Sequence, residues 1–199
     1  MKYHGGSVNR AVLSGIEGLD QTIKRPALTD EMFGRFQKVI HADPAARAAY
    51  PDLAGMLRRV HAKLTAQPGT ATFTAQGAST PVTVTLDGFA VQMLASGSIA
   101  DPPAAARLPP LYLALDKGMY ERAAPLVWNM RQQVAGFRGM PDAMDLASGA
   151  TPARLKLVTK EAETSLLADT LNFPMPQIMG IRPQIDAGDA FRAPFRSDI

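Results

Sequence analysis

Cysteine is absent from the chain of 199 residues. Its absence excludes disulfides, thiolate metal sites and a cysteine nucleophile, and it leaves the compartment open, with the cytoplasm favoured. Long apolar runs are missing as well. The densest stretch, Phe89 to Ile99, is interrupted by Gln92, Ser96 and Gly97 and is shorter than the roughly 18 residues that a membrane span needs. Since the first residues also lack the charged-then-apolar layout of a signal peptide, we expect a soluble globular protein with no membrane partner.

Aromatic residues are few, at 7% of the chain. The net charge is only +3, so neither positive nor negative residues are in large excess. The densest basic cluster is Arg58, Arg59, His61 and Lys63, a spacing typical of the solvated face of one helix. A nucleic-acid interface needs a concentrated basic stripe and usually stacking aromatic side chains. The sequence therefore predicts no nucleic-acid partner.

The motifs of common catalytic sites are also missing. The nucleophile elbow G-x-S-x-G, the zinc motif H-E-x-x-H and the glycine-rich phosphate loops do not occur. We expect His41 and His61 to be solvated or to interact with a helix C-terminus, and most paired acids to be helix caps or solvated. The acid pairs are Asp30/Glu31, Asp142/Asp145, Glu161/Glu163 and Asp186/Asp189. No catalytic residue, metal site or cofactor is predicted.

What the chain does have is helical periodicity, which predicts a mainly α fold of about seven helices with one small β-hairpin. The predicted helices span residues 30–42, 51–66, 88–96, 103–117 with a break at 108–110, 120–137 and 152–171. Thr151-Pro152 gives the strongest start signal, a side-chain cap followed by proline. Residues 71–75 and 81–86 alternate and predict the hairpin, with Val82, Val84 and Leu86 on one face. Residues 180–199 are expected to be irregular.

The segment Val8 to Ile16 is typical of a buried parallel strand, which needs neighbours that this sequence does not offer. An edge strand or a short helix remains the alternative. Exposed strand edges are templates for pairing. We therefore expect this strand to pack onto the helices, to pair with the hairpin, or to pair with a second copy in a homodimer.

Several segments resemble the lid region of α/β-hydrolases of the proline iminopeptidase and tripeptidyl-aminopeptidase-like branch. VNRAVLSGIEGLDQTIKRP (8–26) resembles the strand and loop that lead from the core into the lid, and DAGDAFRAPFRSDI (186–199) resembles the return to the core. MDLASGATPARL from Met144 and EAETSLLADTLNFP up to Pro174 resemble the lid itself. The resemblance implies that residues 1–25 end the hydrolase core, 26–180 form the helical lid, and 181–199 lead back to the core.

The resemblance also implies where substrate specificity resides. Better-known aminopeptidases of this branch carry a Cys-x-Glu motif after the long lid helix, whose acid binds a substrate amine, whereas this chain has Asn172-Phe173-Pro174-Met175 there. Peptidase and esterase activity are therefore equally compatible with it. We expect the stretch Glu161 to Met179 to face the substrate. Its candidate binding residues are Asn172, for its directional amide, and Phe173, Met175 and Met179, for apolar contact area. For Phe173 and Met179, packing in the lid's own core is the alternative.

Two functions are thus expected from different classes. In the first, the chain is the lid of a serine α/β-hydrolase, not catalytic by itself, whose partners are the hydrolase core and a small-molecule or peptide substrate. In the second, it is a free-standing helical binding or interaction module. The two differ in the reading frame: a lid requires G-x-S-x-G coded upstream and the triad aspartate downstream.

Overall fold

The computed structural model describes residues 20–134, 139–175 and 177–193, together with residues 10, 12, 14 and 18. This part of the chain is mainly helical with one two-stranded sheet, so the predicted fold class is confirmed. The elements are α1 (Pro26–Ala42), α2 (Pro44–Ala49), α3 (Leu53–Ala66), β1 (Gly69–Phe73), β2 (Val82–Leu86), α4 (Gly88–Ile99), α5 (Pro102–Ala105), α6 (Leu108–Asp116), η1 (Tyr120–Arg122), α7 (Ala124–Val134), α8 (Met140–Ser148), α9 (Pro152–Ala162), η2 (Ala168–Asn172), η3 (Pro183–Ile185) and α10 (Asp189–Arg192). None of the described helices is long and apolar enough to cross a membrane.

Aspartate side chains mark several helix starts. The carboxylates of Asp43, Asp52 and Asp87 accept the backbone N–H three residues on at 2.8, 2.8 and 2.7 Å, opening α2, α3 and α4. Asp101 caps α5 in the same way at 3.1 Å. These bonds satisfy N–H groups that have no partner within the helix. The recurring Asp residues therefore fix where one helix ends and the next begins.

The hairpin forms as the alternating pattern predicts. Its strands are antiparallel, with Gly69 opposite Leu86 and Phe73 opposite Val82. Val84 and Leu86 are buried, whereas Thr83 and Thr85 are exposed. The buried face packs against α7 and η1, which supplies the support that an isolated hairpin lacks.

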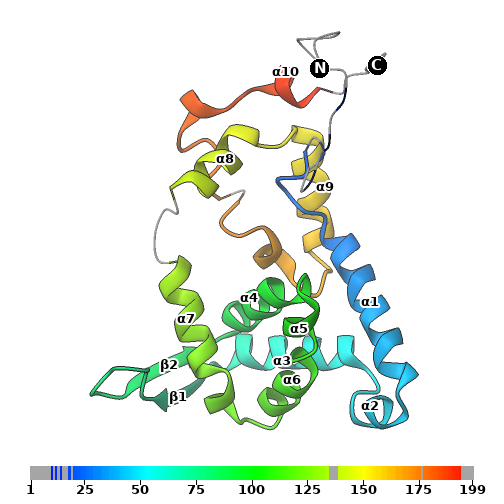
Figure 1. Cartoon of the computed structure of the whole chain (residues 1–199), viewed down its shortest axis with the longest axis vertical. Helices are drawn as coiled ribbons and strands as arrows, with labels where there is room; N and C mark the ends of the chain where they lie inside the picture. Colours follow the sequence, from blue (N-terminus) through cyan, green and yellow to red (C-terminus); the bar gives the residue numbers. More distant parts are fainter. Residues whose placement is uncertain are drawn as a thin grey trace.

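Two hydrophobic clusters hold the molecule together. The large cluster joins α3, α4, α6 and the hairpin at one end of the molecule (Figure 1). The small cluster lies at the other end, beside α8 and α9, and consists of Ile23, Leu146, Ala150, Val158 and Met175. The segment that leads into α1 thus contributes Ile23 to the same small cluster as α8 and α9.

His61 lies in the large core, so the expectation of a solvated histidine is wrong. Its side chain is 7% exposed, and its Nε2 lies 2.7 Å from the Tyr112 hydroxyl. That hydroxyl donates to the carbonyl of Val91 at 2.8 Å. Because a phenol has a single proton to donate, Nε2 must carry the proton that it shares with Tyr112. This chain of hydrogen bonds ties α3, α6 and α4 together.

Several predicted helix boundaries are wrong. The first helix begins at Pro26 and not at Asp30. The break predicted within 103–117 is present, although it falls slightly earlier, because α5 ends at Ala105 and α6 already begins at Leu108. The helix that starts after Thr151 ends at Ala162, short of the predicted residue 171. The short α2 and α8 were not predicted as helices.

The predicted N-terminal strand, Val8–Ile16, lies mostly outside the described residues. Arg10, Val12 and Ser14 are described, and they are exposed and belong to no helix or strand. The strand and the homodimer through it therefore stay predictions.

Candidate functional site

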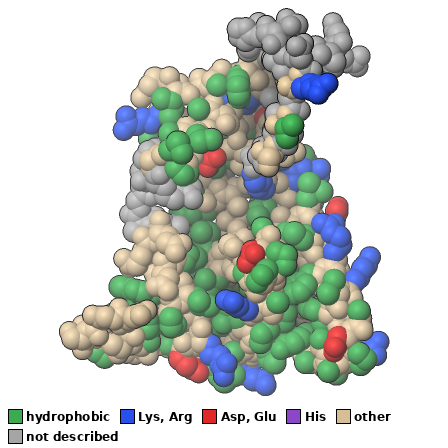
Figure 2. Space-filling view, viewed as in Figure 1, with side chains coloured by type: hydrophobic (Ala, Val, Ile, Leu, Met, Phe, Trp, Pro, Cys, Tyr) green, Lys and Arg blue, Asp and Glu red, His purple; other side chains and the backbone are tan. Residues whose placement is uncertain are grey.

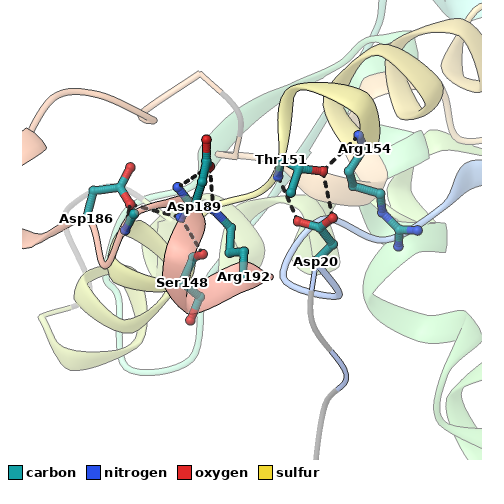
Figure 3. Close-up of polar contacts among 8 residues, drawn as sticks. Asp20, Ser148, Thr151, Arg154, Asp186, Asp189 and Arg192 are labelled. Atoms are coloured by element: carbon teal, nitrogen blue, oxygen red, sulfur yellow. Dashed lines mark hydrogen bonds and ion pairs between the residues drawn. The ribbon is translucent and has the colours of Figure 1, made fainter. Parts of the chain in front are cut away.

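Two segments that are far apart in the sequence meet at one short loop. We call residues 20–25 the incoming segment and residues 180–193 the return segment. Residues 148–151, from the last residue of α8 to the cap of α9, are the junction loop. The carboxylate of Asp20 accepts from both the backbone N–H and the hydroxyl of Thr151, each at 2.7 Å (Figure 3). The Thr151 hydroxyl oxygen in turn accepts the N–H of Arg154 at 3.2 Å and caps α9. The incoming segment is thus bonded to the cap of a later helix.

The return segment binds the other side of the junction loop through Arg192. This guanidinium is 7% exposed and donates to the carbonyl of Ser148 at 2.8 Å. It also donates to Asp186 at 2.8 Å and to Asp189 at 3.1 Å. The bond from Arg192, helped by the N–H of Gly188, lowers the pKa of the Asp186 carboxyl. A cation that is almost fully buried here is therefore neutralised by two acids of its own segment.

Gly149 leaves room for this arrangement. Its φ is +53°, and a Cβ at this position would lie 2.6 Å from Nη1 of Arg192. A Cβ there would force the end of the Arg192 side chain to shift, and residues other than glycine rarely adopt a positive φ. Glycine at 149 thus allows the Arg192 guanidinium to reach the backbone of the junction loop.

Further bonds hold the incoming segment against α9 and η2. Arg154 donates twice to the carbonyl of Ile23, at 2.9 and 2.8 Å. Arg25 forms an ion pair with Glu161, with its Nε 3.0 Å from Oε1, and this bond lowers the pKa of the Glu161 carboxyl. Two acids of the predicted pairs thus have partners far away in the sequence: Glu161 binds Arg25, and Asp30 accepts the N–H of Leu166 at 3.1 Å. Asp186 binds Arg192 within its own segment.

An apolar groove lies between α8 and the start of the return segment. Its volume is about 400 Å³, and it is lined by Ala143, Leu146, Ile178, Ile181, Arg182, Gln184 and Ile185. Leu146 belongs also to the small cluster, and Ile178 packs against that cluster. The groove is therefore the solvent-facing side of the small core, within the part of the chain that forms the junction.

The surface around the groove is unusually apolar for an exposed region. Ile181 is 63% exposed, and Met140 and Met144 on α8 are exposed as well. Figure 2 shows hydrophobic side chains gathered on the surface over α8. Exposed apolar surface that borders a concavity is typical of a site that binds another molecule.

The four predicted binding residues do not line this groove. The amide of Asn172 is bonded to the incoming segment: its Oδ1 accepts the N–H of Lys24 at 2.6 Å, and its Nδ2 donates to the Lys24 carbonyl at 2.8 Å. Met175 is 3% exposed within the small cluster. Met179 packs against that cluster. Phe173 is 36% exposed and packs edge-on against Phe89, with ring centroids 5.2 Å apart.

Sequence reasoning missed the residues that do line the groove. Ile178, Ile181 and Ile185 recur at intervals of three and four residues, which is the helical period of one apolar face. Ile178 lies within the stretch Glu161–Met179 that is predicted to face the substrate, whereas Ile181 and Ile185 lie in the segment that is expected to be irregular.

Among the described residues, no group of three or more His, Asp or Glu side chains is placed to hold a metal ion. No protein-family model, curated protein or solved structure matches the chain. The candidate site consequently rests on the geometry of the junction and the groove.

Proposed function

We propose that this chain is the helical lid of a serine α/β-hydrolase, which covers the active site and shapes the substrate pocket. One observation carries the proposal: the incoming and return segments bind the same junction loop, Asp20 at Thr151 and Arg192 at Ser148. A domain inserted into a host fold must receive and return the chain at one place. The bonds at the junction loop support this arrangement, which the resemblance at both ends implies independently.

The groove supports the same proposal. A lid acts by excluding water and by presenting apolar surface to the substrate beneath it. Ile181 and Ile185 border a groove of about 400 Å³ and belong to the return segment, the part that leads back toward the host. Apolar side chains in this position suit the wall of a substrate pocket. The sequence holds no nucleophile elbow, so the chain's contribution is shape and not bond cleavage.

The first experiment reads the gene and then tests the product. A lid requires G-x-S-x-G in frame shortly upstream and a triad aspartate downstream, and the longer product should react with a fluorophosphonate probe. The chain of 199 residues alone should not react with the probe and should not hydrolyse p-nitrophenyl esters or aminoacyl-nitroanilides. An in-frame stop codon just upstream of this chain together with one just after it would overturn the proposal. Stoichiometric labelling of the chain by the fluorophosphonate probe would overturn it as well.

A second experiment tests the groove in the longer product. Ile181→Ala should change the relative kcat/KM for acyl groups of different size, because a pocket wall discriminates substrates by transition-state contact. Val39→Ala, at an exposed position of α1, is the matched control and should leave the selectivity unchanged. Equal selectivity in both variants would place the pocket elsewhere.

The alternative function, a free-standing helical binding module, is favoured by the same exposed groove. It predicts that the chain binds its partner without any hydrolase core and that the gene begins and ends with this chain. The reading frame therefore separates the two functions before any protein is made.

A further inference from the structure

The described lining of the groove includes a cation, Arg182, that no described residue neutralises. Arg182 lines the groove, and its side chain forms no hydrogen bond or ion pair with any residue that the structure describes. Arg192 of the same segment shows the contrast, because two acids hold it. A guanidinium presents planar donors that match a carboxylate, so Arg182 offers a ready partner for an anion at the groove.

Apart from one amide, the other described residues of the lining are aliphatic. Ala143, Leu146, Ile178, Ile181 and Ile185 supply the apolar surface, and Gln184 is the second polar side chain. None of the lining residues that the structure describes is acidic. An amine would therefore meet a like charge here, whereas a molecule with an aliphatic chain and an anionic end would match both the apolar wall and the cation.

We propose that the groove binds an aliphatic carboxylate, with its chain on Leu146, Ile178 and Ile181 and its carboxylate on Arg182. The groove's volume is about 400 Å³, whereas an engineered apolar cavity of about 150 Å³ holds benzene. At the same space per atom, the groove holds roughly sixteen heavy atoms, so a chain of ten carbons with its carboxylate fits. The inference concerns the chain by itself and holds whether or not the lid proposal does.

The test is a titration of the full chain with decanoate, below the concentration at which it forms micelles. Acetate supplies the carboxylate without the chain, and octyl glucoside supplies a chain without the charge. We expect saturable one-to-one binding of decanoate by isothermal titration calorimetry, and at least tenfold weaker binding of both comparison compounds.

Two variants and one control localise the binding. Arg182→Gln should weaken decanoate binding roughly tenfold, and Ile181→Ser should weaken decanoate and octyl glucoside alike. Lys156→Gln removes one positive charge from the exposed face of α9, outside the groove, and should leave the affinity unchanged. Because Ile181 and Arg182 are both exposed, these variants should fold normally, which circular dichroism checks.

Methionine methyl resonances give a readout that does not depend on affinity. Met175 and Met179 belong to or pack against the small cluster beneath the groove, and Met56 is buried in the large cluster. Decanoate should shift the signals of Met175 or Met179 and leave that of Met56 in place. Binding that does not saturate, an affinity unchanged in Arg182→Gln, or shifts confined to Met56 would each overturn the proposal.

Discussion

At the scale of single residues, His61 is bonded to a phenol in the core, and no carboxylate of the described residues pairs with it. Burial lowers the pKa of His61 from 6.5 to about 4, against a smaller opposing effect of the Leu166 backbone. His61 therefore takes up a proton near pH 6.5 in the unfolded chain, but only near pH 4 in the folded chain. The stabilisation by neutral His61 is complete above pH 6.5 and is lost as the pH falls from there toward 4.

This shift predicts how stability depends on pH. Between pH 7.5 and 5 the free energy of unfolding should fall by about 2 kcal/mol through His61 alone, as measured by urea denaturation. His61→Gln should flatten the dependence. The range stops at pH 5 because Glu161 and Asp186, whose pKa values are lowered, lose their stabilisation only in more acidic solution. An equal slope in the wild type and in His61→Gln would contradict the buried neutral histidine.

Asn172 gives the second prediction at this scale. Because its amide holds the backbone of Lys24 from both sides, Asn172→Ala should lower the free energy of unfolding by about 1 kcal/mol. Asn129→Ala, at an exposed asparagine of α7, is the control and should change it little. In the longer product that the lid proposal expects, Asn172→Ala should lower the melting temperature without changing acyl selectivity. A change in selectivity would instead restore the pocket role that the sequence predicts.

At the scale of secondary-structure elements, α9 depends on a cap that is shared with the incoming segment. Thr151→Val removes both the N-cap of α9 and the hydroxyl bond to Asp20, so it should cost about 1–2 kcal/mol. Thr151→Ser keeps the hydroxyl and should retain most of the stability. Thermal denaturation of the two variants side by side measures the difference, and equal melting temperatures would show that the cap contributes nothing.

The elements also show what the sequence could predict. The hairpin, with Val84 and Leu86 buried, and the start of α9 at Thr151-Pro152 follow from local rules: alternation, capping and proline. The end of α9 does not, because residues more than a hundred positions away determine it. Asp30 accepts the N–H of Leu166, and Arg58 donates to the carbonyl of Thr164, so these backbone groups leave the helical pattern.

The same reasoning explains the outcome at the candidate site. Asn172, Phe173, Met175 and Met179 were chosen for their chemistry and their place near the end of a predicted helix. Which of them would be buried depends on the small cluster, whose members come from the incoming segment, α8, the junction loop, α9 and the segment after η2. Ile23 and Leu146 are far apart in the sequence, and no local pattern reveals their contact.

At the scale of the whole molecule, the two hydrophobic clusters differ in size and should differ in stability. The small cluster has few buried members, whereas the large cluster draws on most of the other helices. Local openings cost less free energy where less apolar surface is buried. In native-state hydrogen exchange, the free energies of opening should therefore be lower for the amides of α8 than for the amides of α3. Equal opening energies would show instead that the chain unfolds as one unit.

The meeting of the incoming and return segments at the junction loop also has a mechanical consequence. A force that pulls these two segments apart acts first on the bonds of Asp20 with Thr151 and of Arg192 with Ser148. The large cluster lies outside this load path, because neither bond includes any of its members. Under tension on the two segments, the short elements around the groove would therefore detach first, and the helices of the large cluster would keep their contacts.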